Sequence, residues 1–163
     1  MKDRGRDVRR SESVWDYPRP PRVEPDERHV VVTFSGVLIA DTRRALRVLE
    51  TSHPPTFYIP VEDVRQETLH RSKFRTRCEW KGIATYWDLQ VGALESAQAA
   101  WSYESPMPGY QALASHFAFH AGRVSACEVD GQRVDAQSGD FYGGWITPGI
   151  VGPFKGSPGT AGW

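Results

Sequence analysis

Short runs of apolar, β-branched residues separated by turn-forming residues dominate the hydrophobic pattern of the chain. Residues 30–34 and 37–40 are two such runs, and Ser35-Gly36 between them predicts a tight β-hairpin. Asp130-Gly131 predicts another tight turn, because this dipeptide accommodates the positive φ angles of two-residue hairpin loops. No segment has the periodicity of a long helix or of a βαβ unit. The pattern therefore predicts a mainly β protein.

The segments that follow the first hairpin are less regular. Residues 42–50 fit either a helix or a strand, and the alternation of their apolar side chains favours the strand. A short helical turn is expected between residues 60 and 69, with Pro60 at an early position.

Basic and non-basic side chains alternate along residues 71–80. On a strand, the two alternating sets lie on opposite faces of the sheet. One face would then be a row of cations, and the other would lead inward toward the turn at Trp80. Such a row is typical of a solvated edge strand, whose charges oppose pairing with another edge. Contact with phosphate groups is the alternative interpretation. The basic residues are Arg71, Lys73, Arg75 and Arg77.

Two motifs occur twice in the same order. Trp15-Asp16-Tyr17 is echoed by Trp101-Ser102-Tyr103, and Trp80-Lys81-Gly82 is echoed by Phe154-Lys155-Gly156. The number of residues from Trp15 to Gly36 equals the number from Trp101 to Gly122. This echo predicts an internal duplication with repeats over residues 13–95 and 96–163. It also predicts a second hairpin at Gly122, related by a pseudo-twofold axis to the hairpin at Gly36, with Trp15 and Trp101 in equivalent places.

Length and charge limit the classes of protein. The 163 residues suit one domain, and the 20 basic and 20 acidic side chains cancel, so neither nucleic acid nor a membrane is an expected partner. Residues 1–12 are polar and basic and predict a disordered tail, which leaves residues 13–163 as a single β domain. The proline-rich residues 18–25 predict an extended tether rather than a regular element. No apolar run reaches membrane length, and a cytoplasmic location is expected.

The two cysteines do not indicate a metal site or a disulfide framework. Cys78 and Cys127 are isolated, no Cys-x-x-Cys motif occurs, and no zinc or other cofactor is expected. Cys78 lies close in sequence to Lys81, and a nearby cation favours a reactive thiolate. A buried structural thiol beside Trp80 is the simpler interpretation.

Several motifs together resemble a bacterial and fungal family, the one numbered 427 among the domains of unknown function. The resemblance implies a compact fold of coiled antiparallel β-sheets, similar to the β-tent of methionine sulfoxide reductase B and the cereblon ligand domain. It implies no established activity. Glu79 departs from the family pattern, which usually shows proline between the cysteine and the tryptophan of this motif. The matching segments are residues 39–46, 50–55, 58–60, 62–64, 78–82, 100–103, 129–131, 141–145 and 152–156.

Some labels of that family mention nucleotidyl transfer, which the residues do not favour. Transfer assisted by two metal ions needs clustered carboxylates that hold the ions about 4 Å apart. Glu62 and Asp63 are adjacent and would point apart on an extended chain. No acidic pair follows Gly143-Gly144, and residues 152–156 lack the pattern of a phosphate-binding loop.

Aromatic residues next to glycines and prolines predict a ligand pocket instead. Aromatic walls with a few polar groups suit a planar ligand, and a lysine would meet an anionic group. Lys81 is the expected pocket lysine, because the basic strand leads into its turn, whereas Lys155 is expected to be structural. Arg44 and His53 add polar groups. The candidate binding residues are Trp80, Lys81, Trp101, Tyr103, Tyr142, Gly143, Gly144, Trp145, Arg44 and His53.

The sequence leaves three functions open. A domain that binds a small planar or anionic molecule is the leading hypothesis. An enzyme that uses Cys78 or His53 is the second, and a scaffold or interaction module is the third. Lysine stems that merely pack on aromatic faces at the two Trp/Phe-Lys-Gly turns would explain the same motifs without any ligand.

Overall fold

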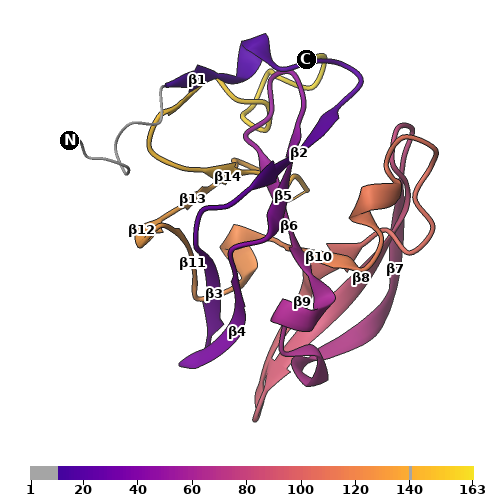
Figure 1. Ribbon diagram of the computed structural model, residues 1–163, viewed down its shortest axis with the longest axis vertical. Helices are drawn as coiled ribbons and strands as arrows, with labels where there is room; N and C mark the ends of the chain where they lie inside the picture. Colours follow the sequence, from indigo (N-terminus) through magenta and orange to yellow (C-terminus); the bar gives the residue numbers. More distant parts are fainter. Residues whose placement is uncertain (1–10, 140) are drawn as a thin grey trace.

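The computed structural model describes residues 11–139 and 141–163 and is mainly β (Figure 1). A seven-stranded antiparallel sheet has the order β2-β5-β6-β10-β9-β8-β7. Its strands are β2 (Arg22–Asp26), β5 (Ala45–Leu49), β6 (Thr56–Pro60), β7 (Leu69–Cys78), β8 (Gly82–Val91), β9 (Leu94–Ser102) and β10 (His116–Phe119).

A four-stranded antiparallel sheet has the order β12-β11-β3-β4. Its strands are β3 (Val30–Phe34), β4 (Val37–Thr42), β11 (Ala126–Val129) and β12 (Gln132–Arg133). Figure 1 shows this sheet and strands β7 and β8 on opposite sides of the central strands β5 and β6.

Two further pairs and five 3₁₀ turns complete the fold. β1 (Glu12–Ser13) pairs in parallel with β15 (Ile150–Val151), and β13 (Asp135–Ala136) pairs with β14 (Trp145–Ile146). Figure 1 shows β1 at the same end of the molecule as the C-terminus. The 3₁₀ turns are η1 (Val14–Asp16), η2 (Val61–Asp63), η3 (Gln66–Thr68), η4 (Gln111–Leu113) and η5 (Ala121–Arg123).

The two tight turns form as the sequence predicts. Ser35 and Gly36 link β3 to β4, and Asp130 and Gly131 link β11 to β12. All four residues have positive φ, from 51° at Asp130 to 79° at Gly131. Positive φ at both central positions is what a type I′ hairpin turn requires. The predicted strand in residues 42–50 is also confirmed as β5, and the helical turn after Pro60 as η2 and η3.

The hairpin predicted at Gly122 is wrong. Gly122 lies in η5, which joins β10 in the large sheet to β11 in the smaller one. The His120 ring accepts the Gly122 N–H at 3.2 Å and caps this turn, so a local side-chain bond replaces the hairpin. Trp15 is 42% exposed whereas Trp101 is buried, so the expected equivalence of these landmarks is also wrong. The division into repeats 13–95 and 96–163 stays a prediction.

The expectations for the basic strand and the proline-rich segment are partly corrected. β7 is an edge strand as predicted, but its pairing with β8 shifts register between Arg71 and Arg75. The strict alternation is therefore interrupted, and Phe74 is 41% exposed instead of pointing inward. Residues 22–26 form the opposite edge strand β2 rather than a tether, and Pro25 lies on an edge, where a missing N–H is tolerated.

Both faces of the central strand β6 are covered. Its alternation sends Phe57 and Ile59 into the core between the two large sheets and Tyr58 into a second cluster on the other face. Trp101 and Tyr103 belong to the same second cluster as Tyr58. This second face holds the candidate site.

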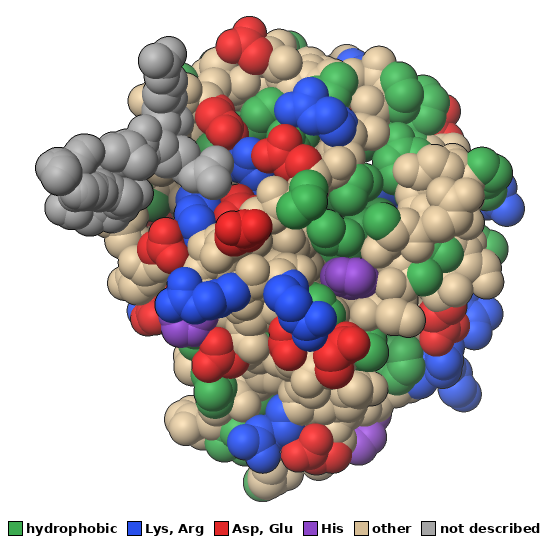
Figure 2. Space-filling view, in the orientation of Figure 1, with side chains coloured by type: hydrophobic (Ala, Val, Ile, Leu, Met, Phe, Trp, Pro, Cys, Tyr) green, Lys and Arg blue, Asp and Glu red, His purple; other side chains and the backbone are tan. Residues whose placement is uncertain are grey.

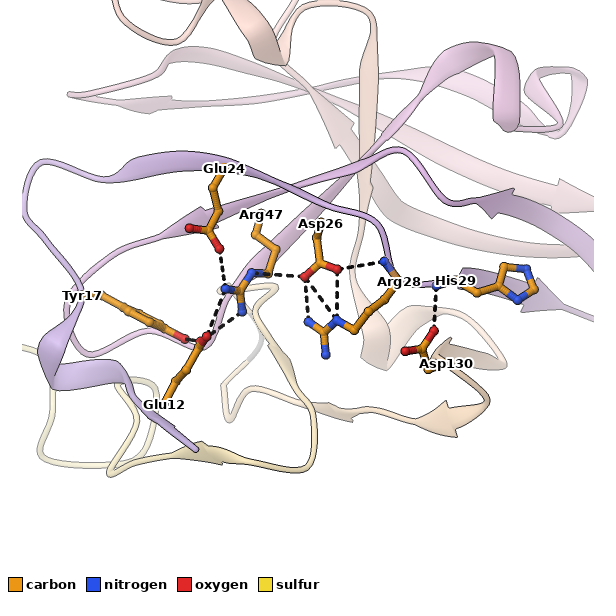
Figure 3. A network of polar contacts seen from close by, with 8 residues as sticks. All are labelled: Glu12, Tyr17, Glu24, Asp26, Arg28, His29, Arg47 and Asp130. Carbon is orange, nitrogen blue, oxygen red and sulfur yellow. Dashed lines mark hydrogen bonds and ion pairs between the residues drawn. The ribbon is translucent and has the colours of Figure 1, made fainter. Parts of the chain in front are cut away.

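A buried arginine ties the N-terminal strands to β5 (Figure 3). The Arg47 side chain is 2% exposed and forms ion pairs with Glu12 at 3.1 Å, Glu24 at 2.6 Å and Asp26 at 3.4 Å. Burial lowers the pKa of Arg47, but its hydrogen bonds to Glu12 and Glu24 outweigh that effect and raise the pKa above its ordinary value.

The predicted tail, residues 1–12, lies outside the described residues except for Ser11 and Glu12. Glu12 belongs to β1, and the division of the chain into a tail and a domain stays a prediction.

Acidic and basic side chains are interspersed over the face shown in Figure 2, in keeping with the balanced composition. Within residues 11–139 and 141–163, no helix is both long enough and apolar enough to cross a membrane.

Candidate functional site

A cavity of about 250 Å³ lies on the second face of the large sheet. Strands β5 to β9, the β7–β8 turn and the loops before β6 and around residues 137–155 contribute to its wall. Eight of the ten predicted site residues line it. They are His53, Trp80, Lys81, Trp101, Tyr103, Tyr142, Gly143 and Gly144.

Aromatic rings that contact one another form much of the wall. The Trp101 indole N–H donates to the Tyr58 hydroxyl at 3.1 Å, and the two rings meet edge to face. Tyr103 and Tyr86 pack against this pair with centroid distances near 6.2 Å. Burial raises the pKa of both Tyr58 and Tyr103 well above the ordinary value, so their hydroxyls stay protonated.

The glycines serve the packing of the wall. A Cβ on Gly143 would lie 2.3 Å from the indole of Trp101, and one on Gly144 would lie 2.6 Å from the Pro54 carbonyl oxygen. Only residues without a side chain permit this approach. The loop therefore closes on the protein's own Trp101 and Pro54.

Two lysines from turns far apart in sequence line the same cavity. The Lys81 ammonium lies 5.9 Å from the centroid of the Tyr103 ring, and the Lys155 ammonium lies 5.4 Å from that of Tyr142. Within the described part of the chain, neither ammonium has a carboxylate within ion-pair distance. Lys155, expected to be structural, thus lines the same cavity as Lys81.

Local contacts explain how Lys81 is held. Its backbone N–H contacts the Cys78 sulfur at 3.5 Å, and its carbonyl accepts the Met107 N–H at 2.9 Å. Gly82 follows with a φ of 113°, which lets the chain reverse directly into β8. These backbone contacts hold the turn on both sides of Lys81, which is only 9% exposed.

His53 is neutral at physiological pH. Burial, and to a smaller extent the positive charges of Lys155, Lys81 and Arg19, together lower its pKa to about 4. The ring meets Tyr142 edge to face at 4.9 Å, and its Nδ1 lies 3.3 Å from the side-chain nitrogen of Gln137. Glu50 and Glu79 also line the cavity, so its wall carries charges of both signs.

Two predicted residues lie elsewhere. Trp145 is fully buried on the opposite face, stacked on Phe57 at 4.9 Å, and its indole N–H donates to the Phe119 carbonyl at 2.9 Å. Arg44 is on the surface, where it pairs with Asp63 at 3.1 Å. Neither residue lines the cavity.

Tertiary contacts add residues that the sequence did not single out for the site. Tyr58 is not among the predicted site residues, although its alternation with Phe57 on a strand indicates opposite faces. Gln137 is 3% exposed and bonds to three cavity segments, yet nothing in its local sequence distinguishes it from a surface glutamine.

The cysteines differ in their surroundings. Cys78 lines the cavity and is half-buried, whereas Cys127 lies in the core, where burial strongly raises the pKa of its thiol. Among the described residues, no three His, Cys, Asp or Glu side chains are grouped so as to hold a metal ion. The absence of zinc itself stays a prediction.

A family model described as "Domain of unknown function (DUF427)" matches residues 22–130, more than half of the chain. The chain belongs to this family. The resemblance carried by the sequence motifs is thereby confirmed. A comparison with curated proteins finds no match. The DUF427 match covers the strands and turns that supply Tyr58, Lys81 and Trp101, whereas Gln137, Tyr142 and Lys155 lie beyond its end.

Proposed function

We propose that this DUF427 domain binds a small planar molecule that carries an oxyanion. The observation that supports it most strongly is the convergence of Lys81 and Lys155 in one cavity. Among the described residues, each ammonium has an aromatic neighbour but no carboxylate partner. A cavity of about 250 Å³ suits a small ligand, since it lies slightly below the usual range for drug-sized molecules.

The remaining wall fits the same chemistry. Trp101, Tyr103 and Tyr142 offer flat apolar surfaces for a ring, and the lysines supply charge-assisted hydrogen bonds to its acidic group. Burial of the Lys81 stem limits the motion of its ammonium, so less side-chain entropy is lost when an anion binds.

An enzyme that uses Cys78 or His53 is the second hypothesis from the sequence. Both side chains line the cavity, but no hydrogen bond joins them within the described residues. A thiol activated by a base typically lies within hydrogen-bond distance of that base. Binding is therefore the better supported function.

A matched pair of probes tests the proposal. Benzoate and benzamide share a ring and a size but differ in charge, so benzoate should raise the melting temperature at millimolar concentration and benzamide should raise it much less. Lys81→Met and Lys155→Met should each weaken benzoate binding, as measured by calorimetry, by roughly 10- to 100-fold, the cost of one charge-assisted hydrogen bond.

Lys73→Met is the control, because Lys73 is exposed on β7 and does not line the cavity. It should leave benzoate affinity unchanged. Equal stabilisation by benzoate and benzamide, or an equal loss of affinity in Lys73→Met, would contradict the proposal.

A further inference from the structure

Gln137 has an amide whose orientation is determined by its backbone partners. Its Oε1 accepts the Gly144 N–H at 3.1 Å, and its Nε2 donates to the Lys155 carbonyl oxygen at 2.6 Å. A backbone N–H can only donate, and a carbonyl oxygen can only accept. Exchanging the two amide atoms would therefore break both bonds, at a residue only 3% exposed, where water cannot replace them.

This orientation determines the protonation of the neighbouring imidazole. Gln137 Nε2 also lies 3.3 Å from His53 Nδ1. Because an amide nitrogen can only donate, Nδ1 accepts this hydrogen bond only when it carries no proton of its own. A neutral imidazole then has its hydrogen on Nε2. Among the described residues, the only hydrogen bond of the ring is the one to Gln137, so the Nε2–H remains as a donor beside the cavity.

We propose that Gln137 holds His53 as the neutral Nε2–H tautomer, and that this N–H joins the Lys81 and Lys155 ammoniums as a third donor to the oxyanion of the ligand. The second half of this inference rests on the proposed function. Gln137 is thus a positioning residue, which acts on the ligand through His53 and through the loop that carries Lys155.

The surroundings of His53 oppose a positive charge there. Protonation at Nδ1 would set a ring N–H against the amide N–H of Gln137. Lys155, Lys81 and Arg19 repel the charged form. Glu50 and Glu79 are the carboxylates on the cavity wall. A neutral donor adds a hydrogen bond without adding a third positive charge near the two ammoniums. The other ionisable groups on the wall are Tyr58, Arg77, Cys78, Tyr86, Tyr103 and Tyr142.

Nitrogen NMR of the histidine rings in the full chain tests the tautomer without any ligand. We expect His53 of the wild type to show a protonated Nε2 and an unprotonated Nδ1. Gln137→Met retains the length of the side chain but removes the donor, so the two tautomers should become mixed. Gln137→Glu replaces the donor by an acceptor, so Nδ1 should become protonated and the proton affinity of His53 should rise at least tenfold.

His70 is the internal reference, because it is exposed on β7 and does not line the cavity. Its resonances should be the same in all three proteins. A wild-type His53 protonated at Nδ1, or a tautomer that Gln137→Met leaves unchanged, would overturn the inference. If Gln137→Glu does not fold, Gln137→Met alone decides it.

Calorimetry with benzoate tests the recognition step. Gln137→Met should weaken benzoate binding severalfold, and His53→Phe, which keeps a flat ring without a donor, should weaken it by a similar factor. If the NMR result holds but neither variant changes the affinity, the third-donor role is refuted. If benzoate does not bind even the wild type, the proposed function fails together with that role, whereas the tautomer assignment stands on the NMR data.

Discussion

Gly143 lies directly against the indole ring of Trp101. An added Cβ at this position would come within 2.3 Å of the ring, closer than any real contact of that kind. The loop of residues 141–144 therefore closes one side of the cavity only because Gly143 has no side chain. The neighbouring Tyr142 then faces His53 and the Lys155 ammonium.

Gly143→Ala should therefore destabilise the protein and loosen the cavity wall. Forcing extra atoms into a packed site costs about 1–3 kcal/mol, which urea unfolding would show as a lower midpoint. Gly162→Ala is the control, because an added Cβ there meets nothing within 4 Å and should leave the midpoint unchanged. Equal midpoints for Gly143→Ala and the wild type would contradict the described packing.

The low pKa of His53 makes the stability of the fold depend on pH. Its ordinary pKa is 6.5 and its folded value is about 4, so between these values the unfolded chain binds more protons than the folded one. The contribution of neutral His53 is fully present above pH 6.5 and is lost as the pH falls toward 4. The full effect is on the order of 3 kcal/mol.

Urea unfolding at several pH values between 7 and 4 would measure this slope. His53→Gln should flatten it, whereas His70→Gln, at an exposed position on β7, should preserve it. An unchanged slope in His53→Gln would show that other groups carry the pH dependence.

Arg47→Met should destabilise the fold strongly. The substitution leaves Glu12, Glu24 and Asp26 without their shared cation, and Asp26 is almost fully buried. Removing one partner of a buried ion pair typically costs about 3–5 kcal/mol. Arg44→Met breaks an exposed pair with Asp63 and should cost under about 1 kcal/mol. Denaturant unfolding of both variants checks the contrast, and equal losses would argue against a central role for Arg47.

Thiol labelling should separate the two cysteines. Cys78 lines the cavity and is partly accessible, whereas Cys127 is 1% exposed and its thiol pKa is raised by burial. A small thiol reagent should therefore modify Cys78 in the native protein and reach Cys127 only after unfolding. Benzoate should slow the labelling of Cys78 if it occupies the cavity. Mass spectrometry of the labelled peptides gives both rates, and labelling of Cys127 first would be inconsistent with this structure.

Local patterns in the sequence determined much of the fold. Ser35-Gly36 and Asp130-Gly131 form the tight turns that they predict, because Gly36 and Gly131 adopt positive φ without a steric penalty. The hairpin predicted at Gly122 from residue spacing does not form. The His120 ring accepts a hydrogen bond from the Gly122 N–H there, and the spacing of glycines and aromatic residues gives no sign of this bond. Two segments can repeat the same residue types in sequence, but they take equivalent positions in the fold only if their strands pair in the same way.

The sequence by itself determined a mainly β chain and its family, and it singled out Lys81 and four of the aromatic residues that line the cavity, because these follow from residue type and short motifs. Only the tertiary structure decided which of them meet. Gly144 and Trp145 are adjacent, yet the backbone of Gly144 borders the cavity whereas the indole of Trp145 stacks on Phe57 in the core. Lys155 and Gln137 join the site through contacts between distant segments, which depend on the folded positions of whole strands and loops.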